Sequence, residues 1–367
     1  MIPFLDLSRQ HEAIKGELVA ALETVLASSR FVLGPEGQAL EDELAARCGA
    51  RYGVGVGSGT DALRLALTAL GVGPGDEVVT PAFSFVASAS TIVMTGATPV
   101  FVDIEPATLA IDPDALERAL TPRTRAVIVV HLYGHPAPID RVLALARAHG
   151  VAVVEDTAQA IGATWDGRPV GGGGDVACLS FYPTKNLGAC GDGGMVLTSR
   201  DDVAERVRLL RDHGAPRKYM HVQLGYSSRL DELQAALLRV KLSHLPAWTE
   251  ARRRLARRYS EGLSGLDLAL PVERPPARHV YHQFIVKTPK RDALAAALAE
   301  LGVGTAVHYP TMLPSQPLFS RPGAERDFAH SARASAEVLG LPCFPELTDA
   351  EADTVVDRVR EALARVA

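Results

Sequence analysis

The alternation of short apolar runs with helix-forming segments is the feature that most constrains how this chain can fold. Through the first two thirds, valine-rich runs of strand length alternate with stretches rich in alanine and leucine. Strands that are apolar throughout are typical of a mostly parallel sheet with helices on both faces, so we predict an α/β fold. The predicted strands are Val54–Val56, Glu77–Thr80, Val100–Asp103, Ala126–His131, Val151–Asp156, Val176–Phe181 and Met195–Thr198.

Helix signals fill the intervals between these strands. Asp112 is a suitable N-cap, Pro113 suits a first helical turn, and Gly71 and Gly150 suit helix ends. The predicted helices are Gln38–Cys48, Asp61–Leu70, Ser84–Thr95, Pro113–Leu120, Ile139–His149 and Asp201–Asp212.

The pattern changes after Asp231. We predict two long helices, a strand, a helix and a second strand; these are Glu232–Leu245, Trp248–Leu263, Val280–Lys287, Asp292–Leu301 and Val303–His308. The second long helix carries a run of arginines (Arg252, Arg253, Arg254, Arg257 and Arg258), which is expected to form a solvated face. A length of 367 residues favours more than one domain. We predict a large domain at 1–245 and a smaller C-terminal α/β domain at 246–367.

Composition excludes several classes of protein. The formal net charge is −5, which argues against nucleic-acid binding and against a polybasic membrane anchor. No apolar run reaches the ~20 residues of a membrane span, and the N-terminus lacks a signal-peptide pattern, so we expect a cytoplasmic protein. The four cysteines form no CxxC pair and no cluster with metal-ligand spacing. Free thiols that are buried or half-buried, and no metal site, are expected.

Polar segments follow five of the predicted strands. In parallel sheets, ligands bind in the loops at the carboxyl ends of the strands. These segments are Gly57–Thr60, Phe83–Phe85, His131–His135, Asp156–Gln159 and Ser180–Lys185. They are therefore expected to form one shared site.

Each chemical signal has an alternative when it is taken alone. Gly57–Thr60 opens a helix whose N–H groups can hold a phosphate, but it could equally be a plain turn. Asp156 could face a cationic ligand atom or cap a short helix. Lys185 lies in a glycine-rich segment, where a desolvated amine can form a Schiff base with a carbonyl.

The combination is more specific than its parts. Pyridoxal phosphate needs a phosphate anchor, a ring to stack on, a carboxylate against its pyridine nitrogen and a lysine for its aldehyde. Gly57–Thr60, Phe85, Asp156 and Lys185 supply these groups in that order. We therefore expect pyridoxal 5'-phosphate as the cofactor.

On these residues the chain resembles the DegT/DnrJ/EryC1/StrS sugar aminotransferases, pyridoxal-phosphate enzymes of fold type I. The pair Ser180-Phe-Tyr-Pro-Thr-Lys185 and Gly191-Asp-Gly-Gly194 is the most specific part of the likeness, which extends over nearly the whole chain. Further segments that carry it are Gly57–Leu63, Gly73–Val78, Thr80–Phe85, Glu155–Ala160 and Arg229–Ala236. The resemblance implies a large domain built on a mostly parallel seven-stranded sheet between helices.

The resemblance also implies roles for individual residues. Lys185 would be catalytic, forming the internal aldimine and shuttling the proton, while the cofactor passes through its pyridoxamine 5'-phosphate form. Asp156 would hold the pyridine nitrogen and Phe85 would stack on the ring. The other cofactor-binding residues would be Ser58, Gly59, Thr60, Gln159, Ser180 and Ser227.

Family members are dimers with shared active sites, which implies a homodimer here. The segment Gly225–Arg229 would reach the partner's site, with Ser227 at a position where many relatives have asparagine. Arg229, His308 and Tyr309 would bind substrate. His135 is expected to be a solvated loop histidine.

The implied reaction moves an amino group from L-glutamate to a keto-sugar nucleotide. The segments Ser228–Asp231 and His308–Pro310 resemble relatives that aminate C3 of a 3-oxo hexose, of the dTDP-3-oxo-6-deoxyhexose or UDP-2-acetamido-3-oxo-glucuronate type. Amination at C4 of a 4-keto-6-deoxy sugar is the nearer alternative. A sugar dehydratase, which would replace Lys185 with histidine, and a regulator, which would carry an added DNA-binding segment, are the others.

Overall fold

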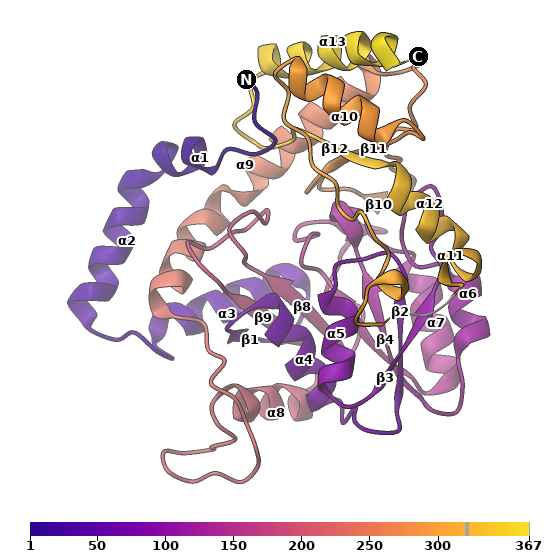
Figure 1. Cartoon of the computed structure of the whole chain (residues 1–367). Helices are drawn as coiled ribbons and strands as arrows, with labels where there is room; N and C mark the ends of the chain where they lie inside the picture. Colours follow the sequence, from indigo (N-terminus) through magenta and orange to yellow (C-terminus); the bar gives the residue numbers. More distant parts are fainter. Residues whose placement is uncertain (320–322, 367) are drawn as a thin grey trace.

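A computed structural model describes residues 1–319 and 323–366 (Figure 1). Its centre is a seven-stranded sheet in the order β1-β9-β8-β5-β4-β2-β3. Only β9 runs antiparallel to its neighbours. The strands are β1 (Tyr52–Val56), β2 (Glu77–Pro81), β3 (Thr98–Val102), β4 (Thr124–Val130), β5 (Ala152–Asp156), β8 (Val176–Ser180) and β9 (Gly194–Thr198). The predicted α/β class and all seven predicted strands are confirmed.

Helices cover both faces of this sheet (Figure 1). Because side chains alternate along a strand, Val78 and Ile128 pack with one helical layer, whereas Val79 and Val127 pack with the other. The first layer contains α4 (Gly59–Ala69), α5 (Ala87–Met94) and α8 (Asp201–Arg211), and the second contains α3 (Pro35–Cys48), α6 (Pro113–Ala119) and α7 (Ile139–His149).

Local sequence signals set several helix ends. The side chain of Asp112 accepts a hydrogen bond from the N–H of Asp114, and Pro113 occupies the first turn of α6, as predicted. Gly150 ends α7 with a φ of 67°, a left-handed conformation that glycine adopts without strain. These caps fix where the loops at the strand ends begin.

A second hydrophobic core lies beyond the sheet. It contains residues from α9 (Glu232–Gly262), β11 (Phe284–Lys287), α10 (Arg291–Glu300), β12 (Val338–Leu341) and α13 (Asp349–Val366). The N-terminal residues Ile2 and Leu5 pack against it. The α9 helix crosses the predicted boundary between residues 245 and 246, and the division into two domains stays a prediction.

The prediction of two helices before and after Pro246 is wrong, because α9 is continuous through the proline. Proline costs a helix one N–H hydrogen bond. The buried face continues across it, with Leu242, Leu245 and Thr249 all buried, and Thr249 donates its hydroxyl proton to the carbonyl of Leu245. Tertiary packing therefore outweighs the local signal.

The strand predicted at Val303–His308 is also wrong. That segment makes only isolated bridges, through Val303 to Ile2 and through Ala306 to Gly340. The partner of β11 is β12, and β11 begins later than predicted because Val280 and Gln283 donate backbone hydrogen bonds to Gly134 and Tyr133 instead. The chain around 280–283 is thereby tied to the end of β4.

The remaining elements are short or peripheral. They are α1 (Leu7–Ala13), α2 (Lys15–Ser28), α11 (Ala324–Asp327), α12 (Ala329–Glu337), the 3₁₀ turns at Leu132–Gly134 and Leu313–Ser315, and the strands β6 (Thr164–Trp165), β7 (Arg168–Pro169) and β10 (Ala277–Arg278). Within the described ranges, no helix has the length and apolar character that crossing a membrane requires.

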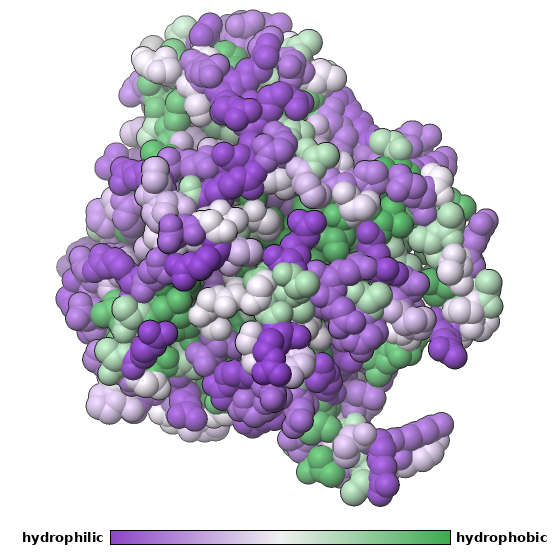
Figure 2. Space-filling model, turned by 180° about the vertical axis from the view of Figure 1, so that it is seen from behind, coloured by the Kyte–Doolittle hydropathy of each residue, from purple (hydrophilic) through white to green (hydrophobic). Residues whose placement is uncertain are grey.

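The segment between α8 and α9 protrudes from the body of the molecule (Figures 1 and 2), and its residues Tyr219 and Leu224 are 85% and 94% exposed.

Candidate active site

The predicted site residues gather at the carboxyl edge of the sheet. Asp156 ends β5, Lys185 follows β8 and Phe85 follows β2. The α4 N-terminus follows β1. In open α/β sheets this edge is where ligands bind, so the topology gives these side chains one common location.

The α4 N-terminus and Ser180 form a narrow cradle. The Ser58 hydroxyl accepts the N–H of Asp61, which leaves the N–H groups of Gly59 and Thr60 at the helix start. A Cβ added to Gly59 would lie 2.5 Å from the Ser180 Cβ, so only glycine fits here. Free N–H groups, a hydroxyl and the positive end of a helix suit a phosphate.

Asp156 and Lys185 influence each other's ionisation. Burial raises the pKa of Asp156, although the N–H of Ala158 and the charge of Lys185 oppose this. Burial lowers the pKa of Lys185 from its ordinary value, although the charge of Asp156 opposes this. The lysine amine is therefore closer to its neutral, nucleophilic form than a solvated lysine.

A buried pair that sequence reasoning did not assign lies beside Asp156. His131 Nδ1 accepts the N–H of Ala137, so its Nε2 donates to Glu155, 3.0 Å away. Burial raises the pKa of Glu155, but this hydrogen bond and the N–H groups of the 171–174 loop lower it below its ordinary value. The His131 N–H also donates to the Asp156 carbonyl. The sequence did carry one indication of this pair, because Glu155 is a charged residue within an otherwise apolar strand, immediately before Asp156.

An aromatic cluster contains two of the predicted site residues, Phe85 and Tyr309. The ring of Phe85 is 50% exposed, and its centroid lies 5.9 Å from that of Tyr309. Gln159 donates to the Tyr309 hydroxyl at 3.2 Å and accepts the N–H of Tyr133 at 2.6 Å. Tyr133, which sequence reasoning missed, also donates its hydroxyl proton to the His308 carbonyl. The structure therefore brings Phe85, Gln159 and Tyr309 together.

The positions of His308 and His135 can be compared with the sequence-based predictions for them. His308 lies beside Tyr309, and its buried Nδ1 has no hydrogen-bond partner within residues 1–319 and 323–366. The expectation that His135 is solvated is wrong, because it is only 6% exposed. Its Nδ1 bonds with the Pro136 carbonyl and its ring packs edge-on against His279, which shields it from water.

Ser227 and Arg229 lie outside this cluster. Arg229 donates to the Ser227 hydroxyl at 2.9 Å and to Asp212 at 2.5 Å. Their neighbour Ser228 accepts the N–H of Gly57 and donates to Asp61, so the segment lies against the start of α4. Its predicted role at a partner's site stays a prediction.

The arginine run of α9 is only partly a solvated face. Arg254 and Arg257 are exposed, but Arg252 is buried, which corrects that expectation for this residue. Arg252 faces the core because it continues the buried row of Leu245 and Thr249. All four cysteines are free, but Cys190 is exposed, which corrects the expectation of a buried or half-buried thiol at this position. Across the part of the chain that the structure describes, no cluster of metal-binding side chains occurs.

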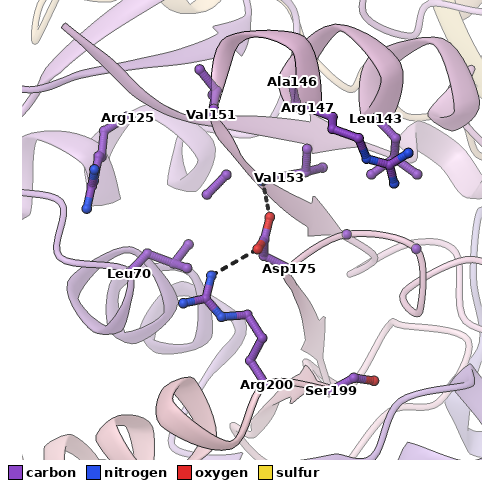
Figure 3. Close-up of a pocket in the computed structure, with 14 residues that line it drawn as sticks. Leu70, Arg125, Leu143, Ala146, Arg147, Val151, Val153, Asp175, Ser199 and Arg200 are labelled. Atoms are coloured by element: carbon purple, nitrogen blue, oxygen red, sulfur yellow. Dashed lines mark hydrogen bonds and ion pairs between the residues drawn. The ribbon is translucent and has the colours of Figure 1, made fainter.

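A cavity of about 550 Å³ lies at the opposite edge, at the amino ends of β4, β5 and β8 (Figure 3). Arg125, Arg147 and Arg200 surround it, and Arg200 points to Asp175. None of the predicted site residues lines it. The candidate site and this cavity are therefore separate places.

Comparison with known families gives one match across the chain. Residues 12–360 match the model of the DegT/DnrJ/EryC1/StrS aminotransferase family. A "pleiotropic regulatory protein" of Geobacillus stearothermophilus is 48% identical over 98% of both chains. A dTDP-3-amino-3,4,6-trideoxy-alpha-D-glucose transaminase of Streptomyces venezuelae is 46% identical, covering 100% of this chain and 97% of its own. A UDP-N-acetyl-3-dehydro-alpha-D-glucosamine 3-aminotransferase of Acidithiobacillus ferrooxidans is 45% identical, covering 99% and 98%.

Solved structures show the same architecture. DesV of S. venezuelae, solved in complex with a ketimine intermediate, superimposes with a TM-score of 0.97 at 46% identity, covering 100% of this chain and 99% of that one. NtdA of Bacillus subtilis, solved with bound cofactor PMP, superimposes with a TM-score of 0.93 at 33% identity, covering 99% of this chain and 85% of that one.

Proposed function

The chain belongs to the DegT/DnrJ/EryC1/StrS aminotransferase family, and from that premise we propose that it aminates C3 of a 3-oxo hexose in a sugar nucleotide. The observation that carries the proposal is the convergence of Lys185, Asp156, the α4 N-terminus and Phe85 at one edge of the sheet. The names of two relatives at 45% and 46% identity, both of which place the amino group at position 3, support C3 over C4.

The residues present fit pyridoxal phosphate. The helix start at Gly59 and the Ser180 hydroxyl suit a phosphate, and a Cβ at residue 59 would crowd Ser180. Asp156 is a buried carboxylate, Phe85 offers an exposed ring face, and Lys185 is an amine with a lowered pKa. When bound, the cofactor supplies an aldehyde for amines and a ring that withdraws electrons from the adjacent carbon.

In the proposed reaction, side chains of this protein transfer protons and orient the reacting groups. The Lys185 Nζ accepts the proton that leaves the donor carbon and returns a proton to the acceptor, which its lowered pKa favours near neutrality. Asp156 is placed to hold a proton on a ring nitrogen, and the Glu155–His131 pair fixes the strand end on which it lies. Gln159 orients Tyr309 beside the reacting groups.

We further propose L-glutamate as amino donor and a homodimer as the working form. The exposed apolar side chains of the protruding segment, Tyr219 and Leu224 among them, support an intersubunit contact. The segment leads directly into Gly225–Arg229, the residues expected to reach the partner's site. Light scattering of the purified protein should give twice the chain mass of 39.0 kDa.

The experiment follows absorbance of the purified holoenzyme. L-Glutamate should convert the visible cofactor band into an ultraviolet band, and a 3-oxo sugar nucleotide should restore it. A 4-keto sugar linked to the same nucleoside diphosphate (dTDP or UDP) and lacking the 3-oxo group serves as the control. Mass spectrometry and NMR of the product should place the new amine at C3; an amine at C4 would overturn the regiochemical assignment.

A regulatory role is the second candidate function, supported by the name of the relative at 48% identity. A protein of that kind would bind the cofactor and leave it unchanged when donor and acceptor are added. The same absorbance experiment separates the two functions, because only an aminotransferase cycles between the two bands.

A further inference from the structure

A cavity of about 370 Å³ adjoins Lys185 on the side of the second hydrophobic core. Its lining includes the N-terminal segment, the lysine loop, α9, and the segments before β11 and after residue 305. The lining residues that matter here are Phe4, Thr184, Arg252, His282, Gln283 and His308. Its volume lies in the range of small-molecule sites, ~300–1,000 Å³.

Both chain neighbours of Lys185 belong to this region. Thr184 lines the cavity, and the Asn186 Oδ1 bonds with His282 Nδ1 at 3.0 Å. Burial and the charge of Lys185 together lower the pKa of both His282 and His308. The cavity therefore adjoins the loop that carries Lys185.

Arg252 is the cation of this cavity. It is 5% exposed, and within the described ranges all its hydrogen bonds leave from Nη1, to the carbonyls of Tyr281, His282 and Cys343. Over the same residues it forms no direct ion pair and no carboxylate lines the cavity, although the charge of the nearby Glu346 opposes the lowering of its pKa by burial. A buried guanidinium without an anion is costly, and its remaining N–H groups match a carboxylate.

Three further buried polar atoms lack a partner around the cavity. They are Gln283 Oε1, Asn186 Nδ2 and His308 Nδ1, counted over residues 1–319 and 323–366. Gln283 and Asn186 are 9% and 5% exposed. Asn186 Nδ2 is a donor and Gln283 Oε1 is an acceptor. Buried polar groups are normally hydrogen-bonded, so these atoms point to a ligand that carries both donors and acceptors, as an amino acid does.

We propose that this cavity binds the carboxylate of the amino donor, held by the N–H groups of Arg252 and of the Gln283 amide, with the donor amine directed towards Lys185. The inference rests on the proposed transamination and assigns its donor subsite. The cavity is too small for a sugar nucleotide but suits a dicarboxylic amino acid. Arg252, the cation that lines it, favours a donor with a side-chain carboxylate over one with an uncharged side chain.

The first test measures binding without chemistry. Glutarate, a five-carbon dicarboxylate that lacks an amine, is titrated into the cofactor-free full chain by calorimetry. The expected result is binding that weakens about tenfold or more in Gln283→Glu, which keeps the side-chain shape and adds a like charge. Arg257→Gln, which removes an exposed arginine from the same helix, should bind glutarate like the unaltered protein.

The second test uses the holoenzyme. Gln283→Glu and Arg252→Lys should raise the KM for glutamate in the donor half-reaction by about tenfold or more, and the effect on the sugar half-reaction should be smaller. Circular dichroism and a thermal melt check that each variant is folded. Unchanged glutarate binding and unchanged donor KM in Gln283→Glu would overturn the inference. If the unaltered holoenzyme converts no amino acid, the proposed function itself fails.

Discussion

The two cavities at opposite ends of the sheet differ in the kind of cation that lines them. The larger one, of about 550 Å³, is lined by Arg125 and Arg147, which are exposed, and by Arg200, which is paired with Asp175 at 3.0 Å. The smaller one, of about 370 Å³, contains the buried Arg252. Volume alone would favour the larger cavity as a ligand-binding site, whereas its buried cation and its unpaired polar atoms favour the smaller one.

The difference has a physical basis. An exposed guanidinium keeps its water shell, and water screens its attraction for an anion. A buried guanidinium has lost that shell, so an anionic ligand gains more from meeting it. The smaller cavity also adjoins the carboxyl edge of the sheet, where Lys185 lies. The comparison teaches that a site is identified by polar groups that folding leaves unsatisfied.

The largest expected effect is that of Lys185→Ala. Removing the amine removes the group that moves the proton, so kcat should fall by ~10²–10⁴-fold or more. The absorbance assay of the holoenzyme measures this loss. Lys290→Ala, an exposed lysine before α10, is the matched control and should keep full activity. Retained turnover in Lys185→Ala would remove the chemical reason for preferring this end of the sheet.

Asp156→Asn should have the next largest effect. The carboxylate raises the pKa of Lys185, so its removal should shift the lysine titration to lower pH. Reductive methylation of the cofactor-free protein, read by mass spectrometry against pH, measures that shift. Turnover should fall by about 10²-fold, because the proton on the ring nitrogen loses its partner. A lysine titration that stays in place would show that the two groups do not interact.

Gly59→Ala should weaken cofactor binding. The added methyl would lie 2.5 Å from the Ser180 Cβ and 3.1 Å from its Cα, so one of the two must move. Overpacking of this kind costs ~1–3 kcal/mol, and a titration with pyridoxal phosphate should show a correspondingly higher Kd. Gly73→Ala is the control, since nothing lies within 4 Å of its added Cβ. Equal affinities in the two variants would argue against a phosphate cradle at α4.

The sheet and the site edge could be predicted because their signals are local. Apolar runs bounded by glycine and proline predicted all seven strands, and the order of Phe85, Asp156 and Lys185 at strand ends predicted their common location. The cap of α6 followed from Asp112 in the same way, whereas the Ser58 cap of α4 was not predicted. Predictions from these local patterns are correct because the tertiary structure requires the same strands and caps.

The features that could not be predicted depend on contacts between distant segments. Pro246 lies within α9 because packing on both sides keeps the helix continuous. Arg252 is buried because the carbonyls of residues 281, 282 and 343 converge on it. His135 is buried because His279 packs against it. The residue type suggested a helix break at Pro246 and solvent exposure at Arg252 and His135, and tertiary contacts decided otherwise.

The smallest expected effect is that of the double change Arg125→Ala and Arg147→Ala in the larger cavity. Both side chains are exposed, and neither forms an ion pair or hydrogen bond that the described residues record, so stability should change by less than ~0.5 kcal/mol. Thermal melts and the two half-reactions measure this, with Gln283→Glu as the contrasting variant. A large loss of turnover in the arginine pair would mean that an exposed, solvated cavity controls the chemistry. That outcome would break the comparison, because burial would then no longer distinguish the functional cavity from the larger one.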